Sequence, residues 1–201
     1  MEKPFWEKTY QDKTVSTFSK GPTSDLKEFA HLLNVPSFVL DVGCGEGRNS
    51  IFLATKNHSV EAFDISAAGI DKAIEIAMNA GLNINFYQQD LTKFIFKNEY
   101  DAILSHGVLH LPEKADRDKF IVEAQKNTKV GGLHFIDIFT NRLPATSDNA
   151  PFTKSLFDVG ELLEIYSKWE IIFHLEKTFT DEHPGGVKHE HAKEQIIAKK
   201  L

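Results

Sequence analysis

Residues 39–49 read VLDVGCGEGRN, and this stretch decides the fold. The apolar run over 38–42 is typical of a buried strand, and the alternating glycines behind it predict a tight turn into a helix over 48–56. Ligands of open α/β sheets bind at the carboxyl ends of strands, beside the point where the strand order reverses. We therefore expect residues 43–47, the glycine loop, to line a ligand site.

Beyond this loop, apolar runs alternate with helical patterns. Strands are predicted over 38–42, 58–64, 84–88, 100–105, 133–139, 169–180 and 195–201, and helices over 48–56, 66–79, 116–127 and 156–166. Such alternation predicts an α/β fold with a doubly wound, mostly parallel seven-stranded sheet. The last two strands have no helix between them, so they should pair antiparallel at one edge of the sheet, which makes the last strand antiparallel. The glycine pair at 131–132 is expected to turn the chain into the fifth of these strands.

The first 35 residues fit no strand, although Trp6, Tyr10 and Phe18 stand among polar residues there. We expect a helical lid segment over 1–35 and a ligand-binding domain over 36–201. A chain of 201 residues is long enough for one buried core.

Composition narrows the classes of partner. The net charge of −6 and the absence of a basic stripe disfavour nucleic acid. No apolar run approaches the roughly 20 residues that span a bilayer, so no membrane partner is expected. The start of the chain lacks the pattern of a signal peptide, which favours a cytoplasmic location. A single cysteine, Cys44, excludes an intrachain disulfide and a thiolate zinc cluster, and we interpret it as a small packing residue.

Three nucleotide-binding interpretations of the glycine loop compete. A phosphate-binding loop would end in Gly-Lys-Ser/Thr, whereas this loop ends in Gly47, Arg48 and Asn49. A dinucleotide fingerprint would need a third glycine where Arg48 stands, which opposes an NAD-linked oxidoreductase. The D-x-G-x-G pattern that starts at Asp41 suits S-adenosylmethionine, because that molecule carries an ammonium group and no phosphate. A loop flanked by Asp41 and Glu46 favours a cation over a pyrophosphate.

Two further acids follow predicted strands. Asp64 ends the second strand and can accept hydrogen bonds from both hydroxyls of a ribose. Asp90 follows the third strand and can accept from the exocyclic amine of an adenine. Each acid taken singly could equally be a helix cap or a turn residue. Their succession behind the glycine loop favours one adenosyl site.

These residues resemble the class I S-adenosylmethionine-dependent methyltransferases over about residues 30 to 200. More narrowly, the chain resembles the TehB-type tellurite-resistance methyltransferases at three places: the helix start at 47–50, the region after the glycine pair and the His-rich tail at 189–192. The turn at 184–186 departs from that pattern. The resemblance implies S-adenosylmethionine as cofactor and tellurite, or other selenium and tellurium oxyanions, as acceptors. It assigns cofactor binding to Asp41, Gly43, Gly45, Gly47, Arg48, Asn49, Asp64, Ile65, Asp90, Leu91, Ser105 and His106.

The region after the fourth strand bears on the methyl acceptor. The Asn/Asp-Pro-Pro-aromatic tetrapeptide of enzymes that methylate DNA or glutamine is absent from residues 105–112, which favours a small-molecule substrate. An activated sulfonium needs alignment more than acid–base help, so no dedicated base is required. Cationic or hydrogen-bonding groups would hold an oxyanion. The candidates are His183, His189, His191, Arg142 and His110.

The histidines at 183, 189 and 191 admit three interpretations: an acceptor site, a solvated hairpin loop or a metal site. We assign His189, His191 and Arg142 to catalysis and no residue to a metal, and we expect His110 to form a pocket wall. Methyl transfer to a different small metabolite stays open, as does a non-catalytic protein that binds S-adenosylmethionine or handles a metal.

Overall fold

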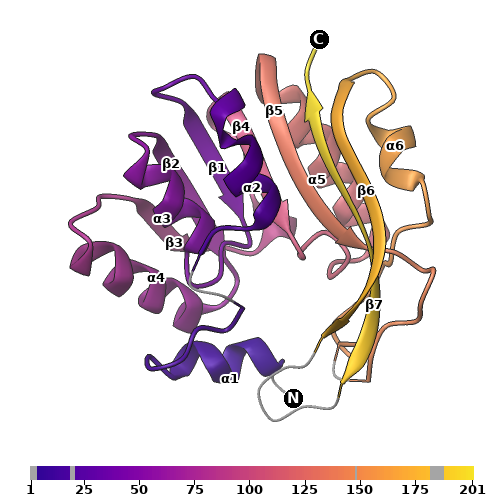
Figure 1. The fold of residues 1–201 in the computed structure, drawn as a ribbon, viewed down its shortest axis with the longest axis horizontal. Helices are drawn as coiled ribbons and strands as arrows, with labels where there is room; N and C mark the ends of the chain where they lie inside the picture. Colours follow the sequence, from indigo (N-terminus) through magenta and orange to yellow (C-terminus); the bar gives the residue numbers. More distant parts are fainter. Residues whose placement is uncertain (1–3, 19–20, 148, 182–187) are drawn as a thin grey trace.

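The computed structural model of the chain describes residues 4–18, 21–147, 149–181 and 188–201. Over these residues seven strands form one sheet in the order β3-β2-β1-β4-β5-β7-β6 (Figure 1). The strands are β1 (Phe38–Val42), β2 (Ser59–Asp64), β3 (Asn85–Gln88), β4 (Tyr100–His106), β5 (Thr128–Phe139), β6 (Glu170–Asp181) and β7 (His189–Lys199).

The first five strands run parallel to one another, and β7 runs antiparallel to both β5 and β6. The strand order reverses between β1 and β4, which places the glycine loop at the switch point of the sheet. The predicted fold class is thus confirmed, with its antiparallel last strand. That strand lies between β5 and β6, so β6 is the edge.

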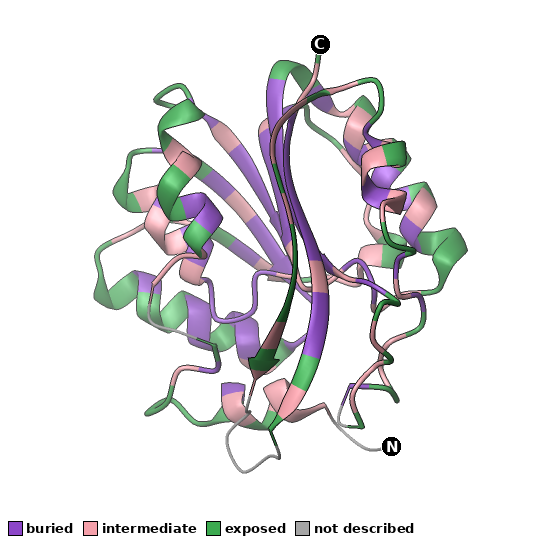
Figure 2. Ribbon diagram, turned by 45° about the vertical axis from the view of Figure 1, so that its right-hand side comes forward, coloured by how far each residue is buried: buried purple, intermediate pink, exposed green. Residues whose placement is uncertain are grey.

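Helices cover both faces of the sheet. The helices are α1 (Phe5–Gln11), α2 (Ser24–Phe29), α3 (Arg48–Thr55), α4 (Ala67–Asn79), α5 (Lys114–Lys126) and α6 (Glu161–Ile165), with short 3₁₀ turns η1 (Ala30–Leu32) and η2 (Leu91–Lys93). Apolar side chains of α2, α3 and α4 pack in one core cluster, and those of α5 and α6 pack in another. Successive strand residues point to opposite faces, so each strand contributes side chains to both core clusters. Figure 2 shows that the strands in the middle of the sheet are largely buried.

The N-terminal segment divides between two environments. Leu26 of α2 is fully buried in the same core as Val39 and Leu53, so α2 belongs to the helices that pack on the sheet. Helix α1 instead lies beyond the carboxyl ends of the strands and packs on α4 (Figure 1). Within the described ranges, none of the helices combines the length and the apolar character needed to cross a membrane.

Several element boundaries differ from the prediction: α6 is limited to Glu161–Ile165, α5 begins two residues earlier, at Lys114, and both β5 and β7 begin earlier than expected. Strand β5 begins at Thr128 and continues through the expected glycine turn, because Gly131 donates its N–H to the carbonyl of Lys200 at 2.8 Å and Gly132 accepts from Lys200. Gly131 has a φ of +78°, and the pairing of β4 with β5 shifts register there. Strand β7 begins at His189 and not at residue 195, so the His pair belongs to a strand.

Candidate functional site

A cavity of about 1000 Å³ opens at the carboxyl ends of β1, β2, β4 and β5. Its walls are the glycine loop, α1 and the far end of the β6–β7 hairpin. Ten of the predicted cofactor-binding residues line it: Asp41, Gly43, Gly45, Arg48, Asn49, Asp64, Ile65, Asp90, Leu91 and His106. Gly47 and Ser105 do not line it.

The glycine loop leaves β1 with its backbone fixed to β2. The N–H groups of Gly43 and Cys44 both donate to the carbonyl of Phe63, at 2.8 and 3.0 Å. At Gly45 (φ +55°) a Cβ would lie 2.3 Å from the hydroxyl of Tyr10, so the α1 tyrosine covers the loop closely. Glycine is required there by conformation and by space.

The two predicted cofactor-binding residues that do not line the cavity, Gly47 and Ser105, have structural roles behind it. Gly47 starts α3 with a φ of +80°, and a Cβ on it would lie 2.9 Å from the ring of Phe86. Ser105 pairs with Val42 in the sheet and is buried on the strand face opposite to His106.

Asp64 joins the glycine loop to the start of α4. Its Oδ2 accepts from the N–H of Gly45 and its Oδ1 from the N–H of Ser66, both at 2.8 Å. Burial raises the pKa of Asp64, and these two hydrogen bonds oppose the rise. Because each carboxylate oxygen has a second lone pair, Asp64 can also accept from two hydroxyls of a ligand in the cavity.

Asp90 both caps η2 and lines the cavity. Its Oδ1 accepts from the N–H and the hydroxyl of Thr92, at 2.9 and 2.8 Å. The capping role that the sequence left open is therefore present, and it leaves the other carboxylate oxygen able to accept from an amine in the cavity.

Asp41 is the most enclosed acid of the site. The hydroxyl of Ser50 donates to it at 2.6 Å, and burial raises its pKa above the usual value. A cationic group in the cavity would compensate this buried carboxyl.

His106 stands in a buried polar network with α2. Its Nε2 lies 2.8 Å from Oδ2 of Asp25, and its Nδ1 lies 3.3 Å from the amide nitrogen of Asn49. Burial alone would lower the pKa of His106, but Asp25, followed by Asp137 and Asp41, raises it above its usual value. The network fixes the His106 ring at the cavity wall and ties α2 to it.

Glu46 and Lys72 form a buried ion pair beside the glycine loop. Lys72 Nζ lies 2.8 Å from Glu46 Oε2, and both side chains are about 5% exposed. The same ammonium donates to the carbonyls of Asp12 and Val15, at 2.9 and 2.6 Å, and Glu46 accepts from the N–H of Thr17 at 3.1 Å. The pair fastens the segment after α1 to the glycine loop.

Aromatic rings line the end of the cavity next to the β6–β7 hairpin. Phe139 lies between His110 and His191, with ring centroids 4.5 and 4.4 Å apart and nearly parallel planes. Burial, and to a lesser degree His191, lowers the pKa of His110 to about 3, so His110 is neutral. It accepts from the N–H of Phe139 and lines the cavity, as expected of a pocket wall.

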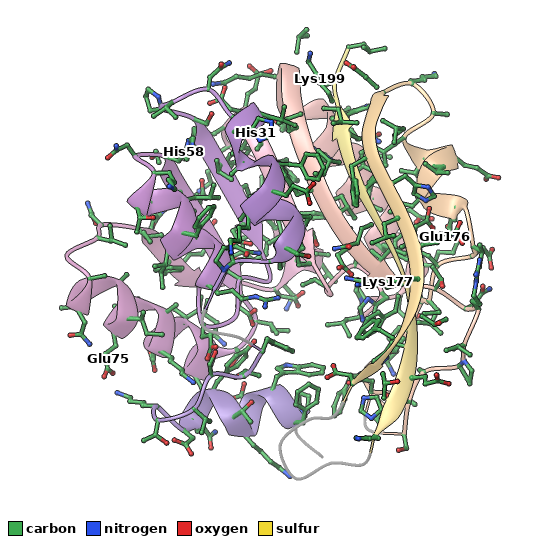
Figure 3. The ribbon with its side chains drawn as sticks, viewed as in Figure 1. His31, His58, Glu75, Glu176, Lys177 and Lys199 are labelled. Atoms are coloured by element: carbon green, nitrogen blue, oxygen red, sulfur yellow. The ribbon has the colours of Figure 1, made fainter. Side chains whose placement is uncertain are left out.

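The predicted catalytic residues do not all meet. His191 lines the cavity, and the ring of His189 lies 4.7 Å from that of His191 without lining it. Arg142 is half exposed, pairs with Glu176 of β6 at 2.5 Å and is not among the lining residues. Figure 3 shows Glu176 beside Lys177 on this edge strand. His183 and the turn at 184–186 fall outside the described residues.

Cys44 is buried in the loop, and burial raises its pKa well above the usual value. A buried neutral thiol agrees with the packing role that we predicted.

A sequence model of the family described as tellurite resistance protein TehB matches residues 3–191. The chain belongs to the TehB family. This confirms the relationship that the glycine loop and the tail had predicted. The protein named probable S-adenosyl-L-methionine-dependent methyltransferase TehB, from Haemophilus influenzae (strain 10810), is 29% identical over 170 residues, which cover 82% of this chain and 58% of that protein. The chain thus spans little more than half the length of this TehB relative.

Solved structures agree with the TehB assignment. The crystal structure of TehB from Haemophilus influenzae superposes with a TM-score of 0.82 at 25% identity, covering 97% of this chain and 67% of the other. The structure of an S-adenosylmethionine-dependent methyltransferase from Methanosarcina mazei superposes with a TM-score of 0.69 at 23% identity, covering 87% and 97% of the two chains, and so shares the fold.

Sequence reasoning missed a polar triad in this TehB-family cavity. Asp137 of β5 accepts from Lys193 Nζ and Gln195 Nε2 of β7, both at 2.6 Å, and all three residues line the cavity. One signal was present: Asp137 is the lone carboxylate in an apolar run close to a strand end. The β7 pairing could not be inferred, because the predicted strand began too late to include Lys193.

Proposed function

We propose that the chain is an S-adenosylmethionine-dependent methyltransferase that acts on a small chalcogen-containing acceptor, with tellurite and selenium or tellurium oxyanions as the leading candidates. One observation carries the proposal: three strand-end acids, Asp41, Asp64 and Asp90, line the same cavity as the glycine loop. Membership of the TehB family supports it.

The residues fit the proposed cofactor. Asp64 would accept from the ribose hydroxyls, Asp90 from the adenine amine, and Asp41 would face the ammonium group with Gly43 close by. When bound, S-adenosylmethionine supplies a methyl group on a positively charged sulfur, which leaves as a neutral thioether when a nucleophile takes the methyl. Acidic groups around the loop favour such a cationic ligand.

The acceptor would occupy the aromatic end of the cavity. His191 and Lys193 bring a hydrogen-bonding ring and a cation to that wall, and Asp137 holds the Lys193 ammonium in place. Such groups can orient an anion whose lone pair points along the line of attack. His189 and Arg142 stay predictions as catalytic residues, Arg142 with the weaker support because it lies outside the lining.

Calorimetry with S-adenosylmethionine, S-adenosylhomocysteine and NAD tests the cofactor. We expect both adenosyl compounds to bind and NAD not to bind; binding of NAD alone would contradict the proposal. Transfer of labelled methyl to tellurite, selenite and small thiols then tests the reaction. Retained binding without transfer to any acceptor would instead favour a non-catalytic binding protein.

A further inference from the structure

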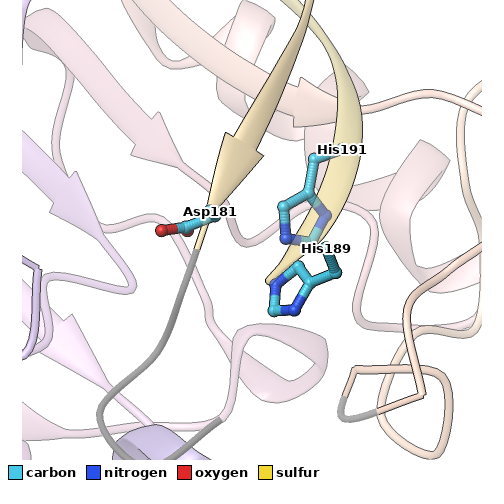
Figure 4. Close-up of side chains that lie close together, drawn as sticks. All are labelled: Asp181, His189 and His191. Carbon is cyan, nitrogen blue, oxygen red and sulfur yellow. The ribbon is translucent and has the colours of Figure 1, made fainter. Parts of the chain in front are cut away.

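Asp181, His189 and His191 meet at the far end of the β6–β7 hairpin (Figure 4). Asp181 ends β6 directly opposite His189, and His191 faces Phe179 across the same ladder. Because His189 and His191 are two positions apart on one strand, their rings point to the same face. The antiparallel register therefore brings two imidazoles and one carboxylate together from two strands.

One ligand atom from each of these residues lies within 4.8 Å of the other two. In a tetrahedral site with metal–ligand bonds of about 2.0–2.2 Å, the ligand atoms are about 3.4 Å apart. Rotation of partly exposed side chains covers that difference, since Asp181 and His189 are only half-buried. We propose that Asp181, His189 and His191 bind one divalent transition-metal ion of the zinc class at the rim of the cavity.

The chemistry of the three ligands agrees with such an ion. Two imidazoles and a carboxylate form the ligand set of open zinc sites, which keep one position for water or substrate. Phe139 stacks on His191 at 4.4 Å, and the Phe179 ring lies 5.4 Å from it. These two rings hold the His191 imidazole in place beside the proposed site. Lys193, a cation on the same cavity wall, is paired with Asp137.

A second cluster on the same hairpin provides a control. His174, Glu176 and Glu194 also lie close together. There the groups already bind one another and their neighbours: Glu194 accepts from His174 at 3.0 Å and from the N–H of Gly160 at 3.3 Å, and Glu176 pairs with Arg142. We expect no metal at this second cluster, which makes its histidine a matched control.

The ion would serve the acceptor, an extension that rests on the proposed function. Asp181 and His191 line the same cavity as the glycine loop, so the open coordination position would face the space where the acceptor binds. A metal ion there lowers the pKa of a bound thiol or selenol and holds the resulting anion as a nucleophile. The substrate class assigned is thus a small chalcogen anion, either a thiolate or selenolate or a chalcogen oxyanion.

The test uses the full chain, without a histidine tag and stripped of metal, titrated with Co²⁺. We expect one Co²⁺ per chain with visible d–d absorption bands, and displacement of Co²⁺ by Zn²⁺. Asp181→Asn and His189→Ala should each weaken binding about tenfold or more, whereas His174→Ala should leave it unchanged. No Co²⁺ binding, or equal binding by the wild type and the two site variants, would overturn the metal site.

Calorimetry with S-adenosylhomocysteine on every variant separates this inference from the proposed function. If the wild type binds S-adenosylhomocysteine but no metal, the metal site alone is rejected. If the wild type does not bind S-adenosylhomocysteine, the proposed function is rejected. Adding a small thiol or selenite to the Co²⁺-loaded chain should shift the absorption bands. Unchanged bands with both compounds would reject the acceptor role of the ion.

Discussion

At the scale of single residues, the site depends on carboxylates that already hold the backbone in place. Asp64 binds two N–H groups of the protein before any ligand arrives, and Asp41 is buried with one hydroxyl donor. Groups fixed in this way lose little conformational entropy when a ligand binds. The same residues therefore shape the loop and recognise what it holds.

Asp64→Asn tests that double role. An amide has one oxygen, so it cannot accept from Gly45, Ser66 and two ribose hydroxyls together. We expect the affinity for S-adenosylhomocysteine to fall by roughly 10–100-fold, or about 1.5–3 kcal/mol. Calorimetry measures the loss, with Asp71→Asn on the exposed side of α4 as the control. An affinity equal to that of the control would remove Asp64 from the ligand site.

The Asp25–His106 pair predicts a pH dependence of stability. The pKa of Asp25 is lowered from 3.8: burial opposes the change, but His106 outweighs it. The ionised Asp25 therefore stabilises the folded state above pH 3.8, and this stabilisation is lost as the pH falls through the lowered pKa of Asp25. Protonated His106 stabilises the folded state fully below pH 6.5, and this stabilisation is lost as the pH rises through the raised pKa of His106.

We therefore expect the pair to stabilise most between about pH 4 and 6.5. His106→Gln should lower the free energy of unfolding by about 3 kcal/mol at pH 6, and by less once the pH has risen through the raised pKa of His106, because the ion pair is then absent from the wild type as well. Urea unfolding across this range measures the difference. A gap that stays constant with pH would show that no charge is shared between the two residues.

At the scale of elements, strand ends and helix starts carry the site. Helix α4 begins behind β2, and the hydroxyl of its N-cap Ser66 accepts from the N–H of Gly69 at 3.0 Å. The same hydroxyl donates to Glu7 of α1. The Ser66 side chain thus caps α4, which packs on the sheet, and contacts α1, which lies over the cavity.

Ser66→Ala should cost about 1 kcal/mol of stability, since it removes the N-cap. Ser66→Asn keeps a capping oxygen and should recover most of that loss. Thermal unfolding of the two variants against the wild type measures both effects. Equal losses would mean that the contact with Glu7, and not the cap, contributes the stability.

At the scale of the whole molecule, the N-terminal segment completes the cavity from outside the sheet. Tyr10 lies over Gly45, and the Glu46–Lys72 pair binds the segment that follows α1. Figure 1 shows α1 between α4 and the far end of the β6–β7 hairpin. Breaking this pair should therefore disturb both the fold and the glycine loop.

Lys72→Met leaves the Glu46 carboxylate buried without its cation, and we expect a loss of about 3–5 kcal/mol in the free energy of unfolding. The double variant Lys72→Met/Glu46→Gln removes the stranded charge and should regain part of that loss. Chemical denaturation of the two variants gives the comparison. A double variant less stable than Lys72→Met would contradict the account of a stranded charge.

The order of strands and helices, the glycine loop and the strand-end acids were predictable from the sequence, because each depends on local periodicity or on residues a few positions apart. What only the tertiary structure decided are the contacts that depend on register and packing: Asp137 with Lys193, Phe139 between His110 and His191, and Glu46 with Lys72. These join segments that are tens of residues apart, and a pattern within one segment says nothing about its partner. Because the predicted start of β7 was six residues too late, the prediction missed that Lys193 and the His pair belong to this strand.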